Sequence, residues 1–117
     1  MDPAAFIART KAYSLRIIRL IDSPPKDDIS RTLGHQLLRA GCSVSANYRA
    51  ATRAKSRADF IAKLGIVEEE CDETVHWLEL LVDSGRIKPA KVALLKQEGV
   101  EIVSMVVASI RTAKSRR

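Results

Sequence analysis

The stretch SVSANYRAATRAKSRADF, from Ser43 to Phe60, shows the helical pattern of this chain most clearly. Apolar Val44, Tyr48 and Ala51 recur at intervals of three and four residues, which is typical of the core-facing side of a helix. Ser56 then stands three residues before Asp59, a capping-box spacing that begins a new helix. Two helices joined by a short turn are therefore predicted. The same stretch also carries four Lys/Arg, whose role is the functional question.

The same periodicity recurs in four segments along the chain. Each segment is bounded by residues that begin or end helices. Asp2 and Pro3 suit the first turn of a helix, and Ser23-Pro24-Pro25 stops it because proline supplies no backbone donor. Gly85 can end the third segment in the left-handed conformation, and Pro89 restarts the chain. We expect helices over about 3–22, 27–54, 57–83 and 89–112.

Four amphipathic helices with short connections predict one all-α domain, an antiparallel up-down-up-down four-helix bundle. A chain of 117 residues is long enough to bury such a core without disulfides or metal. The expected bundle covers residues 1–113, and 114–117 are expected to form a flexible basic tail. A helical hairpin array and a three-helix core with one swapped helix are the alternatives.

Composition argues against membrane insertion and secretion. The longest apolar runs fall far short of the roughly 20 residues that a spanning helix needs. The beginning of the chain, MDPAAFIART, lacks the basic start, apolar block and small-residue cleavage site of a signal peptide. We therefore expect a soluble cytoplasmic protein with no membrane partner.

No residue pattern indicates catalysis or metal binding. Cys42 and Cys71 are expected to be small buried or half-buried side chains rather than a disulfide, and their spacing to His35 and His76 does not match zinc sites. The chain has neither a phosphate-binding glycine loop nor a nucleophile motif. We expect no enzymatic activity, no catalytic residue, no metal and no cofactor.

Charge is strongly segregated along the chain. The net charge of +6 combines a net of +7 over residues 1–57, −7 over 58–85 and +6 over 86–117. Opposite blocks in a compact fold often face each other within or between subunits. A basic composition alone therefore does not establish a nucleic-acid partner.

The second predicted helix carries a basic stripe opposite its apolar face. At 100° per residue, its arginines fall within an arc of about 80°, and two further cations follow in the turn. Three interpretations stay open: a solvated face, pairing with the acidic third helix of the same or a neighbouring subunit, and phosphate binding. No aromatic residue interleaves with the stripe, which disfavours the stacking of bases. The candidate nucleic-acid-binding residues are Arg31, Arg39, Arg49, Arg53, Lys55 and Arg57.

The third predicted helix has apolar residues away from its core face. Ile66, Trp77 and Leu80 cluster there, and aromatic residues are enriched at protein interfaces, so they are candidates for self-association. The alternative is that Trp77 folds over the edge of its own core. On the second helix, Gln36 and Asn47 border the apolar side and are expected to make structural hydrogen bonds.

Three runs of residues resemble a known family. They are QxxRAxxSVxxN from Gln36 to Asn47, RxxSxxDFxxKL from Arg53 to Leu64, and ExxETxxWL from Glu70 to Leu78. The combination is similar to the 23S rRNA-intervening sequence proteins, small four-helix bundles related to the accessory variability determinant of diversity-generating retroelements. The resemblance covers nearly the whole chain.

The resemblance implies a homo-oligomer, with a pentamer as the expected state, and no enzymatic activity. It also implies nucleic acid, RNA or DNA, and a protein such as a reverse transcriptase as candidate partners. The leading hypothesis is therefore an oligomeric accessory factor that binds nucleic acid through backbone charge. The rival hypothesis is a protein scaffold whose basic stripe contacts an acidic partner.

Overall fold

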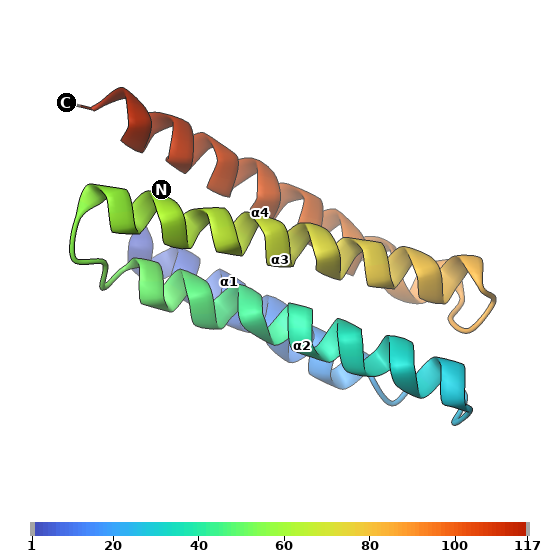
Figure 1. Ribbon diagram of the computed structural model, residues 1–117. Coiled ribbons are helices and arrows are strands. Elements are labelled where there is room, and N and C mark those ends of the chain that lie inside the picture. The colour runs from blue at the N-terminus through green and yellow to red at the C-terminus, as the bar shows by residue number, and fades with distance from the viewer. Residues whose placement is uncertain (1, 117) are drawn as a thin grey trace.

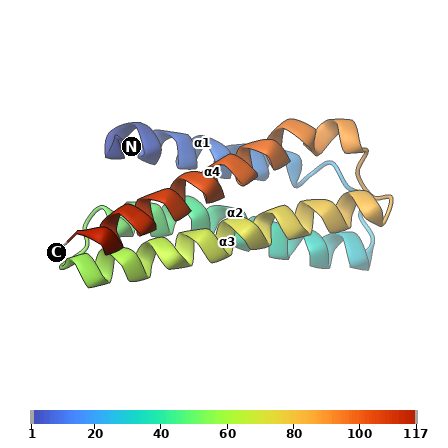
Figure 2. The same cartoon turned by 90° about the horizontal axis from the view of Figure 1, so that it is seen from above.

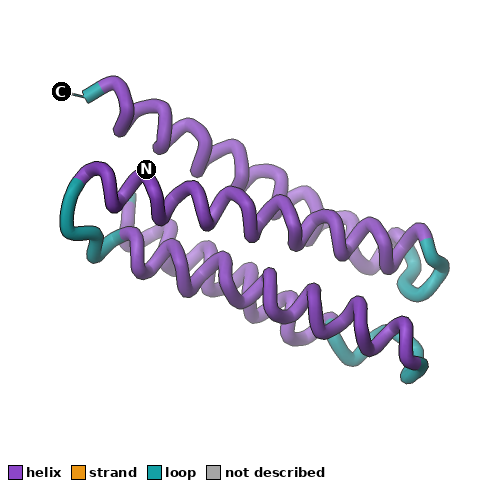
Figure 3. The backbone as a smooth tube through the Cα atoms, in the orientation of Figure 1, coloured by secondary structure: helices purple, strands orange, loops and turns teal. Residues whose placement is uncertain are grey.

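The structure, a computed structural model, describes residues 2–116 and contains four helices connected by short turns. They are α1 (Pro3–Leu20), α2 (Asp28–Ala51), α3 (Arg57–Asp83) and α4 (Pro89–Ser115). The all-α prediction is confirmed, since the described residues contain helices and no strand. Figure 3 shows how short the connections are relative to the helices.

Side-chain caps explain why α2 and α3 begin where they do. The Asp27 carboxylate accepts a hydrogen bond from the Ser30 amide at 2.9 Å, and the Ser56 hydroxyl accepts one from the Asp59 amide at 3.0 Å. The Asp59 carboxylate in turn accepts from the Lys55 amide at 3.0 Å. These bonds satisfy backbone donors that the first helical turn leaves without partners.

The end of α3 follows the predicted glycine stop. Gly85 has a φ of 78°, a left-handed conformation in which residues with a side chain are strained. The Arg86 amide donates to the Leu81 carbonyl and the Gly85 amide donates to the Val82 carbonyl, both at 2.9 Å. This is a Schellman motif, and it turns the chain sharply so that Ile87 packs into the core.

Three predicted boundaries were wrong by two or three residues. α1 ends at Leu20 instead of 22, and α2 ends at Ala51 instead of 54, so that Arg53 lies in the turn rather than on the helix. α4 continues to Ser115 instead of 112 because Ala113 is buried and gives the last turn an apolar contact. Lys114 and Ser115, expected in a flexible tail, therefore belong to the helix; Arg117 lies outside the described residues.

The helices pack in the predicted up-down-up-down order. Consecutive helices contact each other, and together they form a rod of 50 × 21 × 20 Å (Figure 1). The core runs along the rod, and every helix contributes residues to it. Its largest fully buried side chains include Tyr13, Ile17, Leu37, Leu64, Leu78 and Ile102. Within residues 2–116, no helix is both long and apolar enough to cross a membrane.

Among the four pairs of neighbouring helices, the first and last helices, α1 and α4, make the smallest contact. They meet near Gly99, where an added Cβ would lie 2.6 Å from the Tyr13 hydroxyl oxygen. Arg9 also binds both carboxylate oxygens of Glu98, at 2.7 and 2.8 Å. Beyond this contact, α4 leaves the beginning of α1, and Figure 2 shows it crossing over toward the side of α3. The bundle is therefore open at the end that holds both chain termini.

Candidate functional site

The predicted basic stripe does not form one continuous cationic surface. Arg31 pairs with Asp28 at 2.8 Å and also donates to the Lys26 carbonyl. Arg39 reaches across to α3, where it pairs with Glu70 at 3.2 Å and with Glu73. Of the three interpretations of the stripe, pairing with the acidic helix of the same subunit therefore applies to Arg39.

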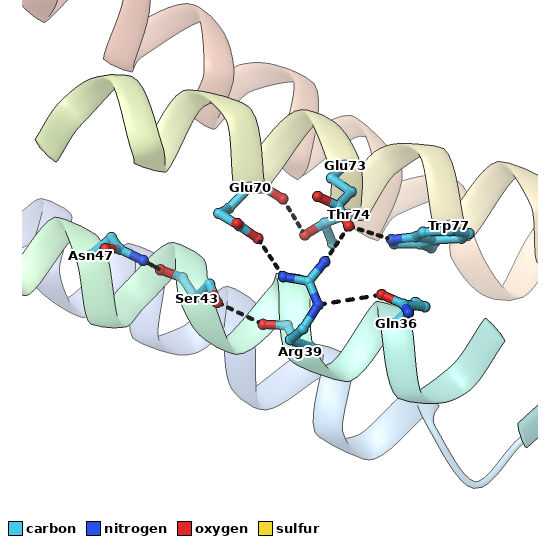
Figure 4. Close-up of polar contacts among 8 residues, drawn as sticks. All are labelled: Gln36, Arg39, Ser43, Asn47, Glu70, Glu73, Thr74 and Trp77. Carbon is cyan, nitrogen blue, oxygen red and sulfur yellow. Dashed lines mark hydrogen bonds and ion pairs between the residues drawn. The ribbon is translucent and has the colours of Figure 1, made fainter. Parts of the chain in front are cut away.

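Arg39 is the centre of a polar network along the contact between α2 and α3 (Figure 4). Its Nε donates to Gln36 Oε1 at 3.3 Å, while Glu73 also accepts a hydrogen bond from the Trp77 indole at 3.1 Å. On the same side of α2, Asn47 donates to the Ser43 carbonyl at 2.9 Å. Gln36 and Asn47 are half-buried and hydrogen-bonded, consistent with the structural role predicted for them.

The other predicted cations gather at the open end of the rod. Arg49 lies in the last turn of α2, Arg53 and Lys55 lie in the turn that follows, and Arg57 begins α3. The antiparallel fold places the last two turns of α4 at the same end (Figure 2). We call this surface the basic pole and define it by seven exposed residues: Arg49, Arg53, Lys55, Arg57, Arg111, Lys114 and Arg116.

The acids in the described part of the chain do not neutralise the basic pole. Within residues 2–116, no carboxylate forms an ion pair with any of the seven cations. Asp59, the acid nearest to them in sequence, instead binds Lys63 at 2.6 Å, and this hydrogen bond is the main reason why the pKa of Asp59 is lowered. The Arg57 guanidinium donates to the Arg116 carbonyl and thereby joins the two parts of the pole.

A groove opens at the basic pole, where α4 departs from α1. It has a volume of about 750 Å³, and all four helices or their flanking turns contribute to its walls. Phe60 and Met105, both half-buried, provide apolar surface, and Tyr48 lies at its floor. Thr52 and Thr112 add hydroxyl groups. Arg116 lines the groove and belongs to the pole, so the groove has a cationic rim.

The three predicted interface residues differ in their surroundings. Ile66 is 41% exposed, whereas Leu80 and Trp77 are half-buried. Trp77 packs against the core cluster, donates its indole N–H to Glu73 and makes an edge contact with the His76 ring. The alternative interpretation, in which Trp77 covers the edge of its own core, therefore describes its environment. A role of Ile66, Trp77 and Leu80 in self-association stays a prediction.

Sequence reasoning overlooked a pair of residues with the spacing of a known metal-binding motif. Glu73 and His76 stand three residues apart, as in the Glu-x-x-His motif of some metal-binding bundles. Glu73, however, is occupied by Arg39 and Trp77. In the described part of the chain, no three His, Cys, Asp or Glu residues are grouped so that they could hold a metal ion.

Comparison with known proteins places the chain in a family. The model of the 23S rRNA-intervening sequence protein family matches residues 5–108, nearly the whole bundle. The chain belongs to this family. No curated protein matches the sequence. A crystal structure of a protein of unknown function from the S23 ribosomal protein family of Bacteroides thetaiotaomicron shares 33% identity with a TM-score of 0.83, covering 89% of this chain and 96% of that one.

The runs of residues that predicted membership of the 23S rRNA-intervening sequence protein family stabilise the bundle. Arg39, Glu70 and Glu73 join α2 to α3, while Ser56 and Asp59 cap the start of α3. These runs therefore specify how the helices begin and pack, and most residues of the basic pole lie outside them. Arg111 was missed as a site residue because it lies about 50 positions from the basic stripe.

Proposed function

We propose that this member of the 23S rRNA-intervening sequence protein family is a non-catalytic accessory factor that binds RNA or DNA through the phosphates. The observation that carries the proposal is the basic pole. Two segments far apart in sequence, 49–57 and 111–116, place seven exposed cations at one end of the rod, without a carboxylate paired to them among residues 2–116. Unpaired lysines and arginines can neutralise phosphates and release the counterions condensed on nucleic acid.

The pole is a better phosphate-binding surface than the stripe along α2. Arg31 and Arg39 already interact with carboxylates, and moving them to a phosphate would leave those acids without partners. Arg49, Arg53, Lys55 and Arg57 have no such competing ion pair among the described residues. The proposed site therefore keeps four of the six predicted residues and adds those from α4.

We further propose that the protein works in the cytoplasm as a homo-oligomer, with a pentamer as the expected state. The resemblance to the accessory determinants of retroelements motivates this stoichiometry, and a reverse transcriptase is a candidate protein partner on the same ground. The exposed side chain of Ile66 and the half-buried Leu80 offer apolar area for contact between copies.

The test is fluorescence anisotropy with labelled RNA and DNA over a series of salt concentrations. In R49Q/R53Q/R111Q, affinity should fall for unrelated sequences, and the plot of log affinity against log salt should flatten by roughly one unit per lost phosphate contact. The matched control, K11Q/R19Q/K26Q, removes the same charge from exposed residues outside the pole. The control should retain most of the salt slope.

Two outcomes contradict the proposal. If both triple variants lose affinity equally, binding follows net charge and the pole has no special role. If the wild-type protein shows no salt-dependent binding to either RNA or DNA, the pole faces a protein. Capture of an acidic protein partner that R49Q/R53Q/R111Q fails to bind would then support the scaffold hypothesis.

A further inference from the structure

The groove at the basic pole exists because small side chains leave space where α1 and α4 diverge. Ala51, Ala54 and Ala108 line it, and none is large enough to fill the gap between neighbouring helices. On the α1 side the wall includes Pro3. Its volume of about 750 Å³ lies within the range of small-molecule sites in proteins, roughly 300–1,000 Å³.

The chemistry of the groove suits a flat ring with polar edges. Phe60 and Met105 present apolar surface against which an aromatic ring can pack. The Thr112 hydroxyl on α4 can donate to or accept from ring nitrogens and carbonyls, whereas the Thr52 hydroxyl already donates to the Arg49 carbonyl at 2.6 Å and is left to accept. Proteins recognise unpaired bases with the same kinds of contact, an aromatic side chain against the ring and hydrogen bonds to the ring edges.

The charge around the groove selects a ligand that also carries phosphates. Arg116 lines the groove, and Arg57 contacts the Arg116 carbonyl at the same rim. The hydroxyl-bearing apolar groove thus adjoins the proposed phosphate-binding surface. Phe60 is the aromatic residue that lines the groove with part of its ring exposed, whereas Tyr48, which also lines it, is only 2% exposed.

From this arrangement we infer that the groove receives one unpaired base of a nucleic acid whose adjacent phosphates lie on the basic pole. The protein then prefers strand ends, overhangs or flipped-out nucleotides over continuous duplex. This inference rests on the proposed function, because it requires that the pole binds phosphates. RNA and DNA share the chemistry that it uses, an aromatic base beside a phosphate backbone.

The experiment compares three hairpins, made once in RNA and once in DNA. One is blunt, one carries a single unpaired 3′ nucleotide, and one carries an abasic residue in the same place. The last two have equal charge, so their difference in affinity isolates the base. Stacking of one base on an aromatic side chain predicts about tenfold tighter binding of the base-bearing overhang at equal salt.

A groove-filling variant tests where the base goes. Ala108→Leu should lower the ratio of the two affinities, base-bearing overhang over abasic overhang, to about one. It should leave the affinity for the abasic hairpin unchanged. The matched control is Ala90→Leu, which changes an exposed alanine in the first turn of the same helix, far from the groove. It should keep the preference.

The possible failures are distinguishable. Equal affinity of wild-type protein for base and abasic overhangs, with a salt slope that R49Q/R53Q/R111Q flattens, would overturn the groove inference alone. A preference that survives Ala108→Leu would also overturn it, because the base would then bind elsewhere. Absence of salt-dependent binding to all six hairpins would overturn the proposed function as well.

Discussion

The guanidinium of Arg57 donates a hydrogen bond to the main-chain carbonyl of Arg116, 59 residues further along the chain. This contact ties the first turn of α3 to the end of α4, and it places two basic segments side by side. Neither segment alone has the charge density of the basic pole. The antiparallel topology, rather than any local run of lysine and arginine, therefore creates the candidate binding surface.

Replacing Arg39 should affect stability without affecting nucleic-acid binding. Arg39→Gln removes the cation between Glu70 and Glu73, so that two like charges one helical turn apart are left without their partner. Because the arginine is half exposed, we expect a loss of about 1 kcal/mol or less in the free energy of unfolding. Urea unfolding followed by circular dichroism measures this loss. Affinity for nucleic acid should stay near that of wild type, in contrast to R49Q/R53Q/R111Q; a comparable loss would place Arg39 in the binding surface.

Gly99 should be intolerant of a methyl group. In Gly99→Ala the new Cβ would lie 2.6 Å from the Tyr13 hydroxyl oxygen and 2.8 Å from a methyl carbon of Val75. We expect a destabilisation of about 1–3 kcal/mol from overpacking, despite the higher helix propensity of alanine. Gly65→Ala is the control, because its added Cβ would meet no atom within 4 Å beyond its own stretch of helix, and it should stabilise the protein slightly.

A second substitution identifies the cause of the Gly99 effect. The Tyr13 hydroxyl is buried without a hydrogen-bond partner among the described residues, and burial raises the pKa of Tyr13. Tyr13→Phe alone should therefore cost little stability. Combined with Gly99→Ala, it should recover part of the loss, since it removes the atom in closest contact. No recovery in thermal or urea unfolding would mean that Val75, rather than Tyr13, limits the space.

The ion pair between Arg9 and Glu98 should contribute to stability at neutral pH and not in acid. The side-chain hydrogen bond from Arg9 lowers the pKa of Glu98 below its ordinary value of 4.5 in the folded protein. This stabilisation is fully present above pH 4.5 and is lost as the pH falls through the lowered folded value. Urea unfolding of wild type and Glu98→Gln should therefore show a difference that is largest near pH 7 and shrinks below about pH 4. A difference that is unchanged in acid would assign the effect to packing.

Self-association should depend on Ile66 if the third helix forms the contact between copies. Ile66→Gln changes a partly exposed residue, so it should leave the helical circular dichroism intact while lowering the mass measured by light scattering. Leu94→Gln is the control, because Leu94 is 79% exposed on α4, away from the predicted interface. A wild-type protein that is monomeric at micromolar concentration would remove the basis for the oligomer proposal.

The sequence alone determined the helices, because helix formation depends on local features. The spacing of Val44, Tyr48 and Ala51, the cap at Ser56 and the left-handed turn at Gly85 act within a few residues, and each has the predicted role. The family, too, followed from short runs of residues. The predicted helix ends were less accurate, because contacts within the bundle determine how far a helix continues. The buried Ala113, for example, extends α4 to Ser115.

Which cations are available for binding depends instead on the tertiary structure. Arg39 and Arg49 look alike in sequence, but Arg39 faces two glutamates of α3, whereas Arg49 lies at the basic pole. The groove likewise depends on the angle at which α4 leaves α1 after Gly99. Ion pairs, grooves and clustered charges depend on distances between residues far apart in the chain, and helical periodicity carries no information about those distances.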